Sequence, residues 1–168
     1  MRMNKTDFNR LMTQLRPKLY RFALAFVKRT DEAEDAVQEI GMKLWERHHE
    51  LAALRSVEAY AMNAVKNRCL DYIRSSRNRM AELSEVTRET HEQTPDKSVE
   101  QADMIGFVRK MIERLPVQQQ MVIRLRDIEG YESEEISEIL EMSEGTVRTN
   151  LSRARQKIRE ELVKFYDK

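Results

Sequence analysis

Apolar residues recur at intervals of three and four positions along most of this 168-residue chain. That interval places side chains on one face of an α-helix, and the face can then pack against a second helix. Only four glycines and three prolines are present, too few for the many turns of a β-rich fold. The spacing therefore predicts an all-α protein.

The apolar stripes predict three helices in the first part of the chain, over residues 6–29, 30–51 and 56–79. Pro17 is expected to kink or break the first helix, because proline lacks the N–H that an interior helical position needs. Asp31 and Glu34 open the second helix in the order of a capping box. Ser56 is expected to cap the third.

The helical pattern fails after Arg79. Residues 81–97 have few apolar side chains, one proline and five acids against two bases, the composition of a flexible, solvated linker. The regions on either side differ in charge, with 16 bases and 10 acids in residues 1–80 and 12 bases and 14 acids in residues 98–168. We therefore expect two small helical domains, 1–80 and 98–168.

Helical spacing returns in the second domain, with predicted helices over residues 98–115, 116–130, 133–140 and a long stretch that begins after residue 143. Pro116 stands where proline favours a helix start, and Gly130 stands where glycine favours a helix end. Ser133 and Ser143 are expected to cap the last two helices.

The sign of the charge reverses between these last two helices. Residues 127–144 hold eight acids and no Lys or Arg, whereas residues 148–159 hold five cations and no acid. A short helix joined to a long one through "EMS" is typical of a helix-turn-helix, whose second helix enters the major groove of DNA. Acids on that helix would be repelled by phosphate. The alternative is an ordinary helical hairpin with a solvated basic face.

Three surfaces are candidates for binding. On the last helix, the side chains that face away from the apolar line are Arg148, Thr149, Ser152 and Arg153. On the third helix, amides and cations that suit base and phosphate contacts share one face at Asn63, Lys66, Asn67, Leu70 and Arg74. On the second helix, a polar stripe that suits docking on a basic partner helix is formed by Asp35, Gln38, Glu39 and Met42. For the second and third surfaces, the alternative is a solvated helix face.

Together these residues resemble an extracytoplasmic-function sigma factor, a small bacterial RNA polymerase sigma subunit of the sigma-70 family. The stretch "AEDAVQEIGMKLW" is similar to region 2.2 of that family, which docks on the β′ coiled coil of core RNA polymerase. The stretch "LPVQQQMVIRLRDIEGYESEEISEILEMSEGTVRTNLSRARQKIR" is similar to region 4. The resemblance implies that residues 1–80 melt and read the −10 promoter element and that residues 98–168 read the −35 element.

The resemblance also implies roles for single residues. The −10 contacts would fall on Asn67, with Asp71 and Arg74 on the following turns and Asn63 and Lys66 beside them. The −35 contacts would fall on the four outward residues of the last helix, with Arg126 and Arg155 near phosphates. The implied partners are core RNA polymerase, through its β′ coiled coil and its β flap, single- and double-stranded promoter DNA, and an anti-sigma factor. Gly41 departs from the family, which has a bulky apolar residue there.

Several other classes of function find little support in the sequence. Cys69 is the only cysteine, and neither it nor the adjacent His48 and His49 has the spacing of a metal site. We therefore expect no metal, no cofactor, no membrane insertion and a cytoplasmic location. No catalytic constellation of an enzyme is apparent. The rivals are a dimeric helix-turn-helix regulator, which leaves residues 1–80 unexplained, and a helical adaptor that binds no DNA.

Overall fold

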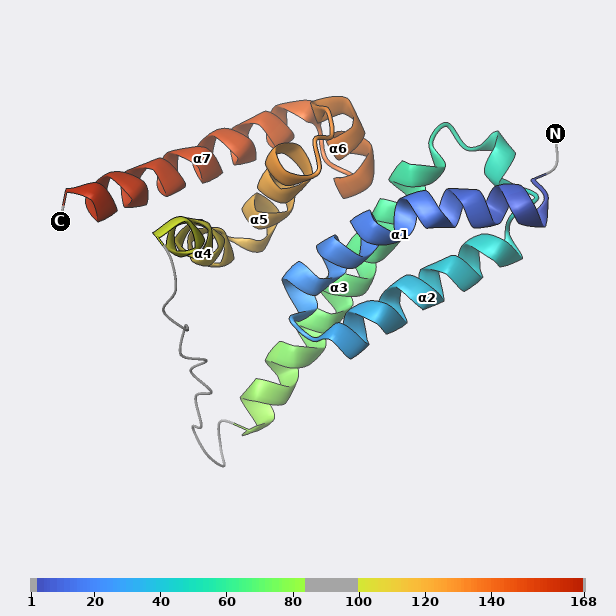
Figure 1. Cartoon of the computed structure of the whole chain (residues 1–168), viewed down its shortest axis with the longest axis horizontal. Helices are drawn as coiled ribbons and strands as arrows, with labels where there is room; N and C mark the ends of the chain where they lie inside the picture. The colour runs from blue at the N-terminus through green and yellow to red at the C-terminus, as the bar shows by residue number, and fades with distance from the viewer. Residues whose placement is uncertain (1–2, 84–99, 168) are drawn as a thin grey trace. The chain divides into compact units, whose positions relative to one another are not determined.

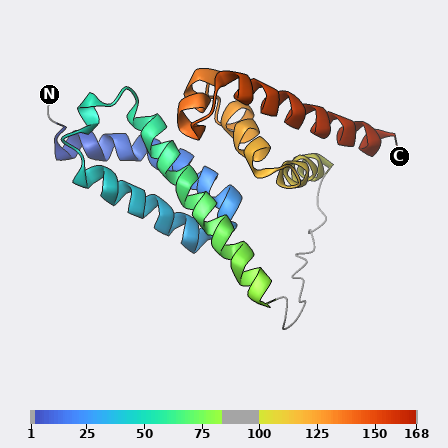
Figure 2. The same ribbon diagram turned by 180° about the vertical axis from the view of Figure 1, so that it is seen from behind.

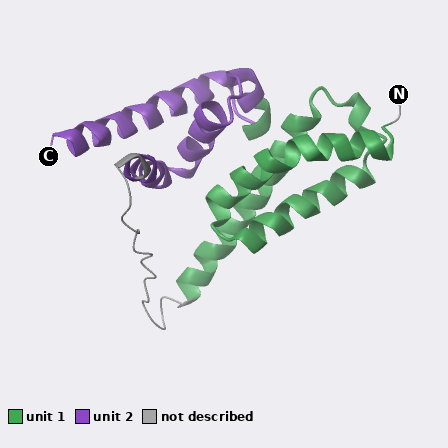
Figure 3. Cartoon of the chain, viewed as in Figure 1, with its two compact units in different colours: residues 1–88, 138–140 green, residues 89–137, 141–168 purple. Residues whose placement is uncertain are grey.

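The computed structural model describes residues 3–83 and 100–167, with the backbone alone for residues 100–102. Every regular element in these residues is a helix, which confirms the all-α prediction. Figures 1 and 2 show the helices from opposite sides. By its internal contacts the chain divides into two compact units, 1–88 with 138–140 and 89–137 with 141–168 (Figure 3).

The first unit is built from α1 (Lys5–Val27), α2 (Thr30–Glu46), the 3₁₀ turn η1 (Leu51–Ala53) and α3 (Val57–Leu83). Helices α1, α2 and α3 pack against one another (Figure 1). Their apolar faces meet in a core whose fully buried members include Leu19, Phe22, Leu44 and Val65. The stripes that predicted the helices therefore also form the core.

Helix α1 is continuous through Pro17, so the proline does not break it, and the helix bends along its length (Figure 1). Two other details of the first unit differ from expectation. Helix α2 has Arg29 at its N-cap position with no side-chain cap, and Asp31 lies in the first turn, where it pairs with Arg29 at 2.8 Å. The predicted capping box is therefore wrong. Helix α3 continues past Arg79 to Leu83, because Met-Ala-Glu-Leu contains only good helix formers.

Most of the predicted linker, residues 84–97, lies outside the described residues. Ser56 does cap α3, since its Oγ accepts a hydrogen bond from the backbone N–H of Ala59 at 3.0 Å. None of the described helices is long and apolar enough to cross a bilayer.

Gly41 gains a structural explanation from the packing of α2 on α1. A β-carbon at Gly41 would lie 3.2 Å from Cε of Met12, a side chain that is 5% exposed. The Met12 side chain therefore fills the space that a larger residue at position 41 would need. Gly41 therefore lets α2 pack closely against Met12 of α1.

The second unit contains α4 (Glu100–Glu113), α5 (Val117–Ile123), η2 (Arg124–Ile128), the first part of α6 (Ser133–Leu140) and α7 (Glu144–Tyr166). Helix α5 packs on α7, and α4 packs on both. Residues that form the core of this packing include Met121, Val122, Leu125, Val147 and Ala154.

The segment predicted as one helix from residue 116 to residue 130 changes its winding. After α5 the chain continues as the π-helical turn η2, in which the Glu129 N–H donates to the carbonyl of Arg124, five residues earlier, at 3.0 Å. Gly130 follows with φ of +80°, as a helix-ending glycine does. Apolar spacing does not distinguish a π turn from an α turn over so few residues.

Candidate nucleic-acid interface

The turn between α6 and α7 is fixed by local hydrogen bonds. The N–H of Met142 donates to the carbonyl of Ser137 at 3.2 Å, and the hydroxyl of Ser137 donates to the carbonyl of Met142 at 2.5 Å. Glu141 takes the left-handed conformation at the end of α6, with φ of 55°. Ser143 then caps α7 by accepting from the N–H of Thr146 at 3.1 Å, as predicted.

The start of α6 differs from the prediction. Glu132, not Ser133, is its N-cap, and the N–H of Glu132 donates to the carboxylate of Glu135 at 2.8 Å. A carboxylate can accept the same backbone N–H groups as a serine hydroxyl, so sequence alone left two adjacent candidates. The first turn of α6 also holds Glu134, which favours the positive end of the helix dipole.

Helix α7 has one buried face and one exposed face. Val147, Leu151 and Ala154 are buried. The four outward residues predicted from the spacing, Arg148, Thr149, Ser152 and Arg153, are all exposed, and so is Arg155, which the family resemblance placed near a phosphate. Because α7 follows its cap directly, these side chains lie in its first four turns, the part of a recognition helix that meets a groove.

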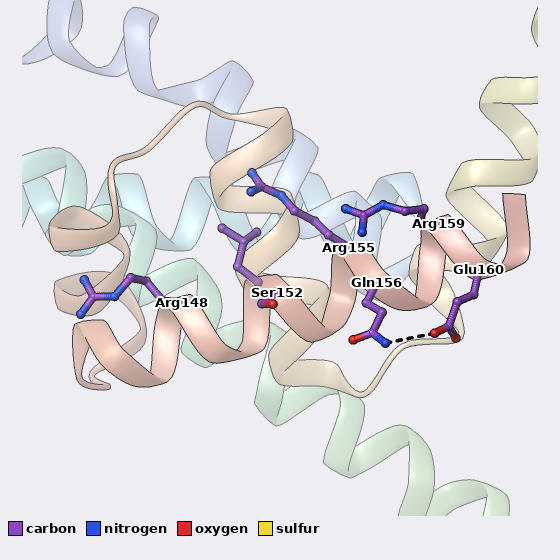
Figure 4. A pocket seen from close by; sticks show the side chains of 7 residues that line it. Arg148, Ser152, Arg155, Gln156, Arg159 and Glu160 are labelled. Carbon is purple, nitrogen blue, oxygen red and sulfur yellow. Dashed lines mark hydrogen bonds between the residues drawn. The ribbon is translucent and has the colours of Figure 1, made fainter. Parts of the chain in front are cut away.

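The structure brings some of these side chains together and separates others. Figure 4 shows Arg148, Ser152, Arg155 and Arg159 following one another along α7, where they line a groove of about 610 Å³. Thr149 and Arg153 do not line it, because one position along an α-helix turns a side chain by about 100°. Thr149 instead donates its hydroxyl to the carbonyl of Gly145 at 2.9 Å.

Arg126 and Arg155 are each held by neighbouring groups of the same unit. Arg126 donates to the carbonyl of Tyr131 at 2.9 Å and lies 2.9 Å from the carboxylate of Glu132. Arg155 donates through Nε and Nη2 to the two carboxylate oxygens of Asp127, at 3.0 and 2.5 Å. The hydrogen bond to Asp127 raises the pKa of Arg155. Sequence reasoning missed both sets of partners.

On α3, the predicted −10 residues have different environments. Asn67, Asp71 and Arg74 are exposed, and Asp71 lies 3.9 Å from Arg74 one turn later. The amide of Asn67 donates to the side-chain oxygen of Asn63 at 3.2 Å. Asn63 is half-buried, and Lys66 is only 5% exposed, so these two do not share the exposure of Asn67, Asp71 and Arg74.

On α2, the predicted docking residues lie along one exposed stripe. Asp35, Gln38 and Met42 are exposed, and 60% of Met42 is open to solvent. Glu39 is half-buried between two cations, with Lys43 at 2.8 Å and Arg68 at 3.3 Å. The hydrogen bond from Lys43 lowers the pKa of Glu39 more than any other neighbour does.

A groove in the second unit is lined mainly by apolar side chains. It has a volume of about 650 Å³ and lies among α4, η2 and α7, with Ile105, Val108, Ile128, Ile158 and Leu162 in its walls. Ile105 is 57% exposed and Ile128 is 53% exposed, and they lie together in this one groove, the kind of apolar patch that marks an interaction site. Within the described residues, no three His, Cys, Asp or Glu side chains gather as a metal site requires.

Comparison with known families identifies both parts of the chain. Residues 11–79 match the family described as Sigma-70 region 2, and residues 108–158 match the family described as Sigma-70, region 4. The second match contains the cap, the turn and the exposed cations of α7 up to Lys157. The first contains the α2 stripe and the α3 residues.

Full-length relatives carry related names. The ECF RNA polymerase sigma-E factor of Haemophilus influenzae is 29% identical, over 92% of this chain and 87% of the relative. The RNA polymerase sigma-H factor of Pseudomonas aeruginosa is 26% identical, over 94% of this chain and 86% of the relative. A longer relative of Xanthomonas campestris, named "Probable RNA polymerase sigma factor RfaY", is 26% identical, and this chain spans 41% of its length.

Two solved structures have the same fold. The sigma factor RpoE, crystallised with the anti-sigma factor NepR from Bartonella quintana, has a TM-score of 0.72 at 24% identity, over 93% of this chain and 96% of that one. CnrH, in complex with the cytosolic domain of CnrY, has a TM-score of 0.66 at 21% identity, over 95% of this chain and 89% of that one.

Proposed function

We propose a promoter-reading role for this chain, which belongs to the sigma-70 family of RNA polymerase sigma factors. In this role it binds core RNA polymerase and directs transcription initiation through the −10 and −35 elements. The observation that carries the proposal is the exposed cationic line on α7, directly after the Ser143 cap and inside the region 4 match. A free-standing helix-turn-helix regulator would leave the region 2 match without a role.

The −35 element is assigned to α7. Arg148, Thr149, Ser152 and Arg153 are exposed in the first turns, where a helix in the major groove reaches base edges. Arg126 and Arg155 are held by neighbouring residues, which suits contacts to phosphates at fixed positions along the backbone.

The −10 element is assigned to the exposed side of α3. Asn67, Asp71 and Arg74 combine an amide, an acid and a cation on successive turns, groups that can bind the edges of unpaired bases and the backbone beside them. Asn63 is bonded to Asn67 and would orient its amide. The role assigned to Lys66 remains a prediction from the sequence pattern of this helix, because the side chain is buried in this structure.

Core RNA polymerase is assigned two docking surfaces. The α2 stripe of Asp35, Gln38, Glu39 and Met42 suits the β′ coiled coil, because an exposed methionine beside acids fits a partner helix with basic side chains. The apolar groove of the second unit suits the β flap, since its exposed isoleucines would be covered by an apolar segment.

Further parts of the proposal follow from the family. One protein of the same fold was crystallised with an anti-sigma factor, and another was solved in complex with the cytosolic domain of CnrY, so we include an anti-sigma partner for this chain. A factor that works on chromosomal promoters works in the cytoplasm. Its role is that of an initiation factor, with the chemistry of RNA synthesis left to the polymerase.

Abortive transcription from a promoter library tests the proposal. Core polymerase is incubated on the library with and without this chain, and the short RNA products are sequenced. We expect initiation at a subset of templates that share −10 and −35 sequences, and only when the chain is present. Products that are the same with and without the chain would exclude the sigma function.

A further inference from the structure

The contact between Asp127 and Arg155 joins η2 to the middle of α7, across 28 positions of sequence. Both carboxylate oxygens are used, at 3.0 Å from Nε and 2.5 Å from Nη2, so the two planar groups meet side by side. The Arg155 side chain is 46% exposed and the Asp127 side chain is 37% exposed. Most exposed ion pairs contribute little to the stability of a fold, and bidentate pairs such as this one are the exception. A structural role of the pair therefore has to be separated from a functional one by experiment.

The side-on geometry leaves part of the guanidinium available. An arginine has five N–H donors in a rigid plane, and Asp127 uses one on Nε and one on Nη2. The edge that carries Nη1 is not used by Asp127. Arg155 also lines the groove that holds Arg148, Ser152 and Arg159 (Figure 4), so a phosphate that enters this groove would meet Arg155 among other cations.

The carboxylate is carried by an unusual stretch of backbone. Asp127 lies in η2, where the N–H of Glu129 reaches back five residues to Arg124 and the N–H of Tyr131 reaches back to Leu125 at 2.9 Å. Leu125 is fully buried, so this turn is anchored in the core. Single π turns are rare and often occur at functional sites. Asp127 is therefore a rigidly supported acid at the edge of a cationic groove.

We propose that Asp127 is a positioning residue for DNA binding, which holds the guanidinium of Arg155 ready for a backbone phosphate of the −35 element. The inference rests on the proposed function of α7 and adds to it a residue outside the recognition helix. An arginine that is already ordered loses less side-chain entropy when it binds, which favours the complex. Asp127 also brings a negative charge close to DNA, where it repels phosphate. This direct repulsion must be separated from the effect that Asp127 has on binding through Arg155.

A double-mutant cycle makes that separation. The full chain is prepared as wild type, Asp127→Asn, Arg155→Ala and the double variant, and each is assembled with core polymerase. Binding to a promoter duplex selected in the transcription assay is measured at several salt concentrations. We expect Asp127→Asn to weaken binding roughly 3- to 10-fold when Arg155 is present, and to leave it unchanged or slightly tighter when Arg155 is absent.

The salt dependence provides a readout that a purely structural role would not change. Loss of one phosphate contact lowers the slope of log affinity against log salt by about one. The slope for Asp127→Asn should therefore move toward that for Arg155→Ala. Asp127→Glu, which keeps the carboxylate, should recover part of the lost affinity.

Two controls complete the experiment. Glu160 lines the same groove and accepts a hydrogen bond from Gln156 at 3.1 Å, so Glu160→Gln removes an acid from the groove without touching the Arg155 pair, and no loss is expected. Affinity for core polymerase is measured separately, because Asp127 also borders the apolar groove.

Tighter DNA binding by Asp127→Asn when Arg155 is present would overturn the inference. An equal loss of affinity with and without Arg155 would also overturn it. If the wild-type holoenzyme shows no promoter preference over core, the proposed function itself fails.

Discussion

At the scale of single residues, Arg148 and Arg155 lie on the same line of α7 but are held differently. Arg148 meets Glu144 through one contact of 3.4 Å, and its side chain is 64% exposed. Arg155 is fixed by two hydrogen bonds to Asp127. A loosely held guanidinium near the helix start can turn toward a base edge, whereas a fixed one suits a phosphate.

Substitution of the two arginines should therefore give different results. Arg148→Ala should cost about 1–3 kcal/mol of binding free energy on the preferred sequence and relax the preference at one −35 position. Arg155→Ala should weaken binding to all sequences alike and flatten the salt dependence. The measurement is holoenzyme binding to single-base variants of the −35 element at two salt concentrations. Equal, sequence-independent losses for both variants would remove Arg148 as a base reader.

Cys69 should be chemically inert in the folded chain. It is fully buried, and burial raises the pKa of its thiol to about 12, so the reactive thiolate is strongly disfavoured near neutral pH. Iodoacetamide at pH 8 should modify the native protein far more slowly than the urea-unfolded protein. Equal rates under the two conditions would show that the α3 core around Cys69 is open.

At the scale of helices, the sequence predicted the elements better than their ends. Ser56 and Ser143 cap their helices as expected, whereas Ser133 does not, because the adjacent Glu132 is the N-cap of α6. The cap at Glu132 and the π turn at η2 were missed. In both cases two neighbouring residues or windings fit the sequence equally well, and tertiary packing decides between them. The spacing of apolar residues is the same for either one.

Two helical glycines give a matched test of packing against helix propensity. Glycine costs about 1 kcal/mol relative to alanine inside a helix. At Gly106 no described atom lies within 4 Å of an added β-carbon, so Gly106→Ala should raise the free energy of unfolding by about that amount. At Gly41 the added carbon meets Met12 at 3.2 Å, so Gly41→Ala should gain less.

Urea denaturation of both variants measures the difference. A gain at Gly41 as large as that at Gly106 would show that Met12 moves aside without cost. Met12 has a flexible side chain, so a small positive gain at Gly41 is the expected result.

At the scale of the whole molecule, the fold could be read from the sequence but the site only in part. The exposed residues of α7 follow from helical spacing, since a residue opposite a buried line must face solvent. The Asp127–Arg155 pair does not follow, because it depends on how α5 and η2 pack against α7. The burial of Lys66 was also missed, since a lysine on a polar stripe is usually exposed.

The α2 stripe gives a prediction for assembly. Asp35 is exposed, whereas the neighbouring Glu39 is already shared by Lys43 and Arg68. Asp35→Arg should therefore weaken binding to core polymerase, because it places a cation against a basic partner helix. Asp7→Arg makes the same change of charge at an exposed position on α1, outside the stripe, and should have a smaller effect. Unchanged core affinity of Asp35→Arg, measured by fluorescence anisotropy, would count against this docking site.

The central claim is that one chain joins core polymerase to the promoter. Abortive transcription from a selected promoter tests it with two defective chains: Asp35→Arg, which keeps the DNA surface, and the Arg148→Ala, Arg155→Ala double variant, which keeps the docking surface. We predict promoter-specific initiation with the wild-type chain, and from a mixture of the two variants no more than the sum of their separate activities. Restoration of wild-type initiation by the mixture, or no promoter-specific initiation by the wild type, would contradict the claim.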